Sequence, residues 1–316
     1  MRTTGTNTRS LAIDANNDLW VGGLGNAQHQ LYDGATGAPV ASGNPPFNSF
    51  NNGNGGYGAL VDGNGIVWSA SSPSGSNRLV RHDPTTGVPQ NVNTGGRVTY
   101  GMAVDTNGKV WVSNWTQNSV QRYAADGTLE GTFGSSSSAI RGVAVTPGDN
   151  NVWVAGSGSA TVTRHNNDGS VAATIGVGST PTGVAVDSAG KVWVTNYSSN
   201  NVMRIDPATN MVDLTVDLGP SANPYNYSDM TGSVSSGITN PTGNWRDVFD
   251  AGSPGVTWDQ IFWNTEAEGD IPAGTSITVE ARAADSLLAL AGAAFTSYNS
   301  GDLMGLSVSL LRSGLF

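Results

Sequence analysis

Short apolar runs alternate with turns rich in Gly, Asn and Ser along most of this chain. In residues 101–123, GMAVDTNGKVWVSNWTQNSVQRY, a first apolar run ends at Asp105, a TNG turn follows, and valines then alternate with Trp111. A polar loop, NWTQN, leads to a third run over residues 119–123, and an ADG turn leads to a fourth, TLEGTF. Alternation with a period of two between tight turns predicts four antiparallel strands.

The same pattern recurs along the chain. Residues 183–205 are identical to residues 101–123 at 13 of 23 positions. The unit is marked by a tryptophan in an LWV, VWS or VWV context, at Trp20, Trp68, Trp111, Trp153 and Trp193, with spacings of 48, 43, 42 and 40 residues. An Asp lies six residues before four of these tryptophans, and Thr146 replaces it in the fourth copy. Five copies therefore run from about Ser10 to Gly219.

Four antiparallel strands in a repeat of roughly 40 residues are typical of a β-propeller blade. We therefore predict an all-β fold, in which residues 1–219 form five four-stranded blades around a common axis. Because blades stack face to face, the repeated tryptophans should be buried between them. An arginine that recurs in the third strand, at Arg81, Arg122, Arg164 and Arg204, should pair with an Asp of a neighbouring blade.

The pattern changes after Gly219, where the Pro/Asn-rich stretch PSANPYNYSDMTG follows without another VWV unit. Residues 220–316 contain apolar alternations such as TSITVEARAAD and LMGLSVSLL at intervals of 10–20 residues. They predict a small β-sandwich-like module. Its expected core residues are Trp245, Trp258, Trp263, Ile277 and Val279. The stretch DSLLALAGAAF, residues 285–295, fits either a short helix or a buried connection.

Composition limits the possible partners. The net charge of -10, with 24 acidic and 14 basic residues and no basic run, disfavours nucleic acid. Cysteine is absent, so disulfides and zinc–thiolate sites are excluded. No apolar stretch is long enough to predict a membrane span, and no signal peptide is present in these residues. We expect a monomer, in an extracellular or cell-surface location.

Units of the form G-x-A-V-D-x-x-G-x-V-W-V-x-N resemble NHL-type propeller repeats. Over residues 10–219 they are most similar to the streptogramin (virginiamycin B) lyase-like group. The final stretch resembles a module appended to secreted bacterial repeat proteins. The resemblance implies a propeller from a bacterial protein, and such propellers serve as enzymes, receptors or scaffolds.

For a lyase, the resemblance implies a magnesium-dependent elimination that opens a cyclic ester. It places a His just before the Gly that opens a blade and a Glu three residues after the Trp. Here the first position holds Tyr57, Tyr100, Arg141 and Thr182, and the second holds Gly23, Ser71, Asn114, Gly156 and Asn196. We therefore predict no catalytic residue, metal site or cofactor. The alternative is a divergent lyase or hydrolase acting on a cyclic ester or lactone, and only this alternative would require Mg²⁺ or Ca²⁺.

The three histidines also offer little for catalysis. His82 and His165 share a third-strand slot that holds Tyr or Ile in other copies, which indicates a packing position. His29 stands where other copies have Leu or Val. Catalytic pairs need side chains that converge, and equivalent places on different blades do not provide this.

The remaining candidates lie on loops that should gather around one mouth of the central channel. The loops that enter the innermost strands and those that join the second strand to the third supply Tyr57, Tyr100, Asn114, Trp115, Asn118, Arg141, Thr182, Asn196, Tyr197 and Asn200. Aromatic rings beside amides suit a neutral polar ligand, which we expect to be a saccharide, a peptide or a protein. The alternative is that the rings fill the channel and the Asn residues form turns.

Overall fold

A computed structural model describes residues 7–43, 45–71 and 78–226, together with shorter stretches between residues 248 and 315. The chain divides into two compact units, Met1–Pro241 and Thr242–Phe316. The boundary predicted at residues 219 and 220 stays a prediction. Residues 223–226, on the far side of that boundary, contact the blades.

Five four-stranded antiparallel sheets make up the first unit, each in the order of its sequence. Blade one contains β1 (Thr8–Ile13), β2 (Leu19–Gly23), β3 (Gln28–Tyr32) and β4 (Ser49–Asn51). Blade two contains β5 (Ala59–Val61), β6 (Val67–Ala70), β7 (Leu79–His82) and β8 (Gln90–Val92). Blade three contains β9 (Thr99–Val104), β10 (Val110–Asn114), β11 (Ser119–Tyr123) and β12 (Leu129–Gly134). Blade four contains β13 (Ile140–Thr146), β14 (Asn151–Gly156), β15 (Thr161–His165) and β16 (Val171–Gly176). Blade five contains β17 (Pro181–Val186), β18 (Val192–Asn196), β19 (Asn201–Asp206) and β20 (Met211–Asp217). The predicted propeller blades are confirmed.

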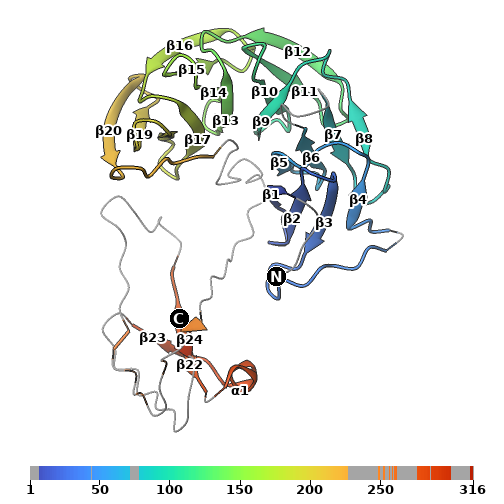
Figure 1. Cartoon of the computed structure of the whole chain (residues 1–316), viewed down its shortest axis with the longest axis vertical. Helices are drawn as coiled ribbons and strands as arrows, with labels where there is room; N and C mark the ends of the chain where they lie inside the picture. The colour runs from blue at the N-terminus through green and yellow to red at the C-terminus, as the bar shows by residue number, and fades with distance from the viewer. Residues whose placement is uncertain are drawn as a thin grey trace. The chain divides into compact units, whose positions relative to one another are not determined.

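The blades follow one another in an arc, with the first strand of each blade toward its centre (Figure 1). Close contacts join β1 to β5, β5 to β9, β9 to β13 and β13 to β17. Blades one and five stand at the two ends of the arc, so the predicted five-fold arrangement is not closed. Leu11 and Ile13 lie on one face of β1 and are each 55% exposed. Met102 and Val104 occupy the same repeat positions in blade three and are buried. Among the described strands, none covers this apolar face of β1 as β5 covers that of β9.

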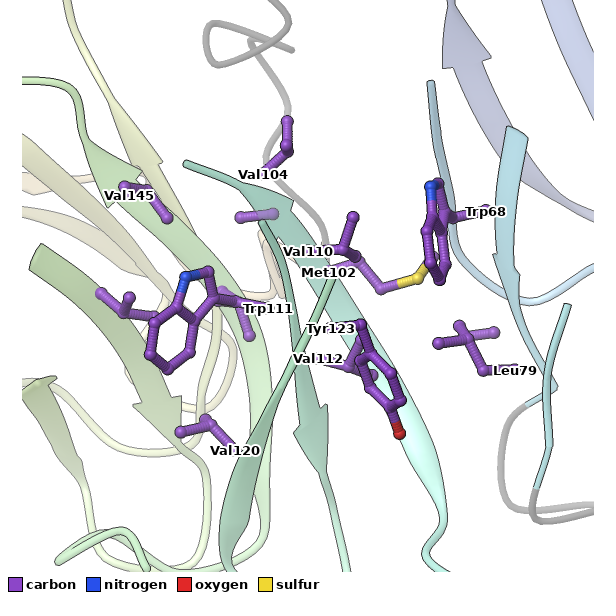
Figure 2. Close-up of a cluster of buried hydrophobic side chains, with 14 of the residues drawn as sticks. Trp68, Leu79, Met102, Val104, Val110, Trp111, Val112, Val120, Tyr123 and Val145 are labelled. Carbon is purple, nitrogen blue, oxygen red and sulfur yellow. The ribbon is translucent and has the colours of Figure 1, made fainter. Parts of the chain in front are cut away.

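Tryptophan packing joins neighbouring blades. Trp68 of blade two and Met102 of blade three lie in one buried cluster, in which the Met102 side chain points toward the indole (Figure 2). Trp20, Trp68, Trp111 and Trp153 are at most 2% exposed. Trp193, in the last blade, is only half-buried. Four of the five predicted core tryptophans are thus sealed by the next blade, and the fifth is not.

The Asp that lies six residues before the tryptophan accepts hydrogen bonds both from the backbone of the turn and from the indole N–H. One carboxylate oxygen of Asp105 accepts from the backbone N–H groups of Asn107 and Lys109, at 2.9 and 3.0 Å. The other accepts from Nε1 of Trp111 at 3.0 Å. In blade four, where Thr146 replaces the Asp, its hydroxyl accepts from Nε1 of Trp153 at 3.1 Å. The spacing of six residues, or of seven in blade four where one residue is inserted, therefore satisfies a buried indole donor.

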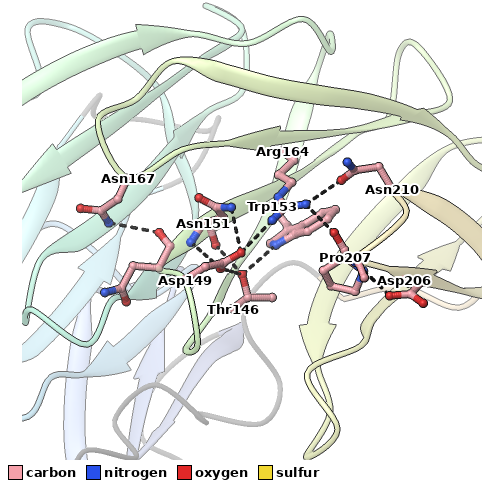
Figure 3. Close-up of polar contacts among 11 residues, drawn as sticks. Thr146, Asp149, Asn151, Trp153, Arg164, Asn167, Asp206, Pro207 and Asn210 are labelled. Atoms are coloured by element: carbon pink, nitrogen blue, oxygen red, sulfur yellow. Dashed lines mark hydrogen bonds and ion pairs between the residues drawn. The ribbon is translucent and has the colours of Figure 1, made fainter.

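The repeated arginine joins each blade to the next. Arg164 lies over the Trp153 ring and donates to the backbone carbonyl of Pro207 in blade five at 2.6 Å (Figure 3). Arg81 and Arg122 donate in the same way to carbonyls of the following blade, at Ala125 and Asn167. The expectation of an Asp in the neighbouring blade was wrong, because a turn carbonyl is the acceptor. Arg204 pairs with Asp213 of its own blade.

The imidazoles lie inside the first, second and fourth blades. His29 stacks on Phe50 with ring centroids 4.3 Å apart, its Nδ1 donates to the Ala27 carbonyl, and its Nε2 lies 2.9 Å from the Ser69 hydroxyl. His82 and His165 are also fully buried and contact backbone carbonyls. Burial lowers the pKa of His29 to about 4, since a charged imidazole would lose its hydration.

This pKa predicts a loss of stability in acid. Between pH 6.5 and pH 4 the unfolded chain binds a proton at His29 that the folded protein does not bind, so the free energy of unfolding falls as the pH is lowered. We expect His29 to account for a loss of about 2 kcal/mol between pH 7 and pH 4.5. Urea denaturation at both values, in the wild type and in His29→Leu, measures it. An equal loss in both proteins would exclude His29 as the cause.

The second unit contains one described sheet, in the order β21-β24-β22-β23. Its elements are β21 (Val248–Phe249), β22 (Val279–Ala283), α1 (Leu287–Gly292), β23 (Thr296–Tyr298) and β24 (Gly314–Leu315). Trp258 and Val279 pack against Ile261 and Ala281, whereas Ile277 is 58% exposed and is not a core residue. Trp245 and Trp263 lie outside the described residues, and the sandwich is described only in part. The stretch 285–295, which the sequence left open between a short helix and a buried connection, contains helix α1, and the hydroxyl of Ser286 caps this helix by accepting from the Ala289 N–H.

Candidate ligand-binding mouth of the propeller

The mouth lies where the innermost strands begin. Tyr100, Arg141 and Thr182 are each the second residue of β9, β13 and β17, and Tyr57 precedes β5. In blade one, Arg9 of β1 holds the equivalent position, and its guanidinium lies over the Tyr57 ring, 5.0 Å from the centroid. The strand register of the repeat therefore brings five residues that are far apart in sequence to one end of the unit.

Three phenol hydroxyl groups form a chain across the mouth. The Tyr57 hydroxyl donates to that of Tyr100 at 2.8 Å, and the Tyr100 hydroxyl lies 2.5 Å from that of Tyr225. Tyr57 and Tyr100 are 4% and 2% exposed. Burial, followed by these hydrogen bonds, raises the pKa of Tyr100 well above its ordinary value. The phenol therefore stays neutral and acts as a hydrogen-bonding group.

Arg141 lies between aromatic rings. Its guanidinium carbon is 5.8 Å from the ring centroids of Tyr100 and Trp115 and 5.5 Å from that of Tyr225. Nη1 donates to the Tyr225 hydroxyl at 3.2 Å. Contacts of this kind hold a cation over ring faces. Nε of Arg141 and Nε1 of Trp115 are buried and have no hydrogen-bond acceptor among the described residues.

A segment beyond the last blade completes the mouth. The backbone N–H of Asn223 donates to Oδ1 of Asn200 at 3.0 Å, and Thr182 donates to the Pro224 carbonyl at 3.3 Å. Oδ1 of Asn226 accepts from Oγ1 of Thr195 at 2.6 Å. A Cβ at Gly183 would lie only 1.7 Å from that oxygen, so glycine is required for this approach. Tyr225 stands perpendicular to Tyr197, with centroids 5.9 Å apart.

Tyr225 and Asn226 were not among the residues predicted for the mouth, although the sequence carries a signal for them. Tyr225 follows Thr182 by 43 residues, the same interval that separates Tyr57 from Tyr100. Pro224 precedes it as Pro181 precedes Thr182. The segment thus repeats the start of an innermost strand without the VWV run that identified the five blades.

The predicted mouth residues make two kinds of contact. The residues that meet one another or the segment 223–226 are Tyr57, Tyr100, Trp115, Arg141, Thr182, Tyr197 and Asn200. The asparagines also hold the local backbone. Asn114 and Asn196 are buried and bond to Gln121 and Asn201 of their own blades. Asn118 and Asn200 have positive φ, and Asn118 accepts from the Ala139 N–H. Their contacts match the turn alternative, and a ligand role for any of the ten stays a prediction.

A separate groove lies at the opposite end of the strands. It has a volume of about 680 Å³ and is lined by turns of blades four and five, including Thr146, Asp149, Asp187 and Pro207. Thr146 donates to Asp149, which also receives a hydrogen bond from Arg164 (Figure 3). Thr146, Asp149 and Arg164 belong to blade four and bond to one another. We place the candidate site at the mouth, because side chains of all five blades and of the segment 223–226 converge there.

Neither end of the described blades gathers metal ligands. In the residues that the structure describes, no group of three or more His, Cys, Asp or Glu side chains could hold a metal ion. Among these residues there is also no helix long and apolar enough to cross a membrane.

No protein-family model matches the chain, and a comparison with curated protein sequences finds no match. Solved structures do match. A streptogramin B lyase superimposes with a TM-score of 0.61 at 16% identity, over 71% of this chain and 73% of that chain. A catalytically inactive variant of virginiamycin B lyase from Staphylococcus aureus with quinupristin gives a TM-score of 0.60 at 15% identity, over 71% and 75%. A nidogen/laminin complex gives 0.54 at 14% identity, over 70% and 83%. The chain therefore shares the β-propeller fold of these proteins.

Proposed function

We propose that this protein is a binding module whose propeller mouth receives a polar ligand or a protein partner. The observation that carries the proposal is the convergence of Tyr57, Tyr100, Arg141 and Tyr225 on one hydroxyl chain, beside the buried donors of Trp115 and Arg141. An unsatisfied buried donor costs about 1–3 kcal/mol. A ligand that supplies acceptors would remove this cost.

The exposed rings at the mouth suit a saccharide, peptide or protein ligand. Tyr197 and Tyr225 are 38% and 42% exposed, so their faces are accessible beside the hydroxyl chain. Aromatic rings with a polar edge are typical of sites that combine stacking with hydrogen bonds. The fold similarity to a chain of a nidogen/laminin complex supports a binding role as one use of this architecture.

Removing the rings of Trp115 and Tyr197 should weaken binding without unfolding the protein, because both residues follow the end of a strand. We expect Trp115→Ala and Tyr197→Ala each to lose about 1–3 kcal/mol of binding free energy. Arrays of neutral oligosaccharides and of extended peptides identify a probe, and titration calorimetry then measures it. Tyr32→Ala, at the opposite end of blade one, is the matched control. Unchanged affinity in both mouth variants would contradict the proposal.

The enzymatic alternative is a lyase or hydrolase of cyclic esters. The fold similarity to streptogramin B lyase is the reason to consider it. The positions that the resemblance assigns to His and Glu hold phenols, amides, hydroxyls, an arginine and glycines. A neutral phenol with a raised pKa and an amide are poor proton acceptors near neutral pH. We expect no ring-opened product when the protein is incubated with quinupristin and Mg²⁺ and examined by mass spectrometry. Turnover that EDTA abolishes would favour the alternative.

An extracellular or cell-surface location and a monomeric state belong to the same proposal. The location rests on the resemblance of the final stretch to modules of secreted bacterial proteins. Fractionation of cells that express the natural gene, with sedimentation of the purified chain, tests both.

A further inference from the structure

Charged side chains are distributed unequally between the two ends of the blades. The turns between the first and second strands carry Asp14, Asp62, Asp105 and Asp187, and those between the third and fourth strands carry Asp33, Asp83, Asp126, Asp168 and Asp206. All of these turns lie at the end opposite the mouth, because each follows a strand that runs away from it. These nine carboxylates of the blades therefore lie at the end opposite the mouth.

The mouth end carries mostly arginine. Arg9 and Arg141 lie in the mouth, while Arg78 and Arg97 lie on loops that lead into β7 and β9 at the same end. Among the described residues of this end, Asp217 at the end of β20 is the carboxylate, and it accepts from the backbone N–H of Gly219. The described residues of this end therefore carry more positive than negative charge.

The groups inside the mouth are suited to an anion. Nε of Arg141 and Nε1 of Trp115 can only donate, and both are buried without an acceptor among the described residues. The guanidinium lies 5.8 Å from the Trp115 ring centroid, so the two donors belong to one corner of the mouth. Hydrogen bonds from an arginine to a carboxylate are shorter and stronger than those to a neutral oxygen.

We propose that the ligand of the mouth carries a carboxylate group, which the Arg141 guanidinium and the Trp115 indole N–H receive. The inference rests on the proposed binding function. It differs from the expectation of a neutral polar ligand, because it assigns an acidic ligand to the mouth. Raising of the Tyr100 pKa supports it, because a neutral phenol beside the site does not repel an anion. Acidic saccharides and acidic peptides both supply this chemistry.

Two matched pairs of probes test whether binding requires a carboxylate and whether a saccharide or a peptide supplies it. Tetragalacturonate is compared with its methyl ester, and acetyl-Gly-Glu-Gly-Glu-Gly-amide is compared with its Gln counterpart. Titration calorimetry on the full chain, at low and at high salt, measures the affinities. We expect the acidic member of one pair to bind about tenfold or more tightly than its neutral counterpart, and to weaken as salt screens the arginines.

Three variants locate the effect. Arg141→Gln should weaken the acidic probe about tenfold, since it removes the charge. Trp115→Phe keeps a ring but removes the N–H, so it should weaken the acidic probe several-fold more than it weakens the neutral counterpart of that probe. Lys191→Gln removes the same charge at the opposite end, where Lys191 pairs with Asp206, and should change the affinity less than about twofold.

The outcomes separate the two proposals. If the ester or the Gln peptide binds as tightly as its acid, the mouth binds neutral ligands, and the carboxylate inference is overturned while the binding function stands. If Lys191→Gln weakens the acidic probe as much as Arg141→Gln, the effect is long-range attraction, and the assignment to Arg141 is wrong. If none of the four probes binds, the result counts against the mouth as a site, and the inference falls with it.

Discussion

We expect the Trp111→Ala variant to be less stable than the wild type by about 3–5 kcal/mol. Trp111 is fully buried in the cluster that blades two, three and four share, and Arg122 lies over its ring. Removal of the indole leaves a cavity and also leaves the buried Asp105 carboxylate without the N–H that it accepts at 3.0 Å. Urea denaturation followed by far-ultraviolet circular dichroism measures the loss.

The last blade supplies a matched control. Trp193 occupies the same repeat position, and its Nε1 donates to Asp187 at 2.8 Å, but the ring is only half-buried because no further blade of the arc covers it. We expect Trp193→Ala to cost less than about 2 kcal/mol, since less apolar area returns to water. Equal losses in the two variants would show that the outer face of blade five is covered in solution.

Met102→Ala should lower the free energy of unfolding by about 2–5 kcal/mol. Met102 is 1% exposed and its side chain points from β9 toward Trp68 of the preceding blade (Figure 2). It therefore contributes to the contact between two blades as well as to the core of its own. The same denaturation experiment measures the change, and a shift in midpoint without a change in slope would identify it as a loss of stability.

Leu11→Ala tests whether this loss depends on the preceding blade. Leu11 is the first-blade equivalent of Met102 and is 55% exposed. A substitution at an exposed position usually changes stability by no more than about 0.5 kcal/mol. A loss at Leu11 as large as that at Met102 would mean that another surface covers the end of blade one.

The blades and their cores could be predicted from sequence because their signals are local. Alternation of valines around Trp111 and a turn after Asp105 specify a hairpin within about 20 residues, and the repetition of these signals specifies stacked copies. The cap at Ser286 is also local, yet DSLLALAGAAF lacked a clear period and its helix became evident only in the structure. Ile277 shows the limit of alternation, since a strand pattern does not say which residues a second surface covers.

The candidate mouth could be predicted in part. Tyr57, Tyr100, Arg141 and Thr182 were found because they share one repeat position. The asparagines were included with them because Asn serves both turns and ligands, and only their hydrogen bonds distinguish the two uses. Tyr225 was missed because the segment that carries it lacks the rest of the repeat.

The sequence by itself therefore determined the five blades, the positions of their tryptophans and the end at which the variable residues gather. These follow from strand periodicity and turn chemistry, which act between residues close in the chain. Only the tertiary structure decided that the arc stays open between blades one and five, that Tyr225 joins Tyr100 and Arg141, and that Gly183 makes room for Asn226. Each of these depends on the angle between stacked blades and on contacts between residues distant in sequence, which no local pattern specifies.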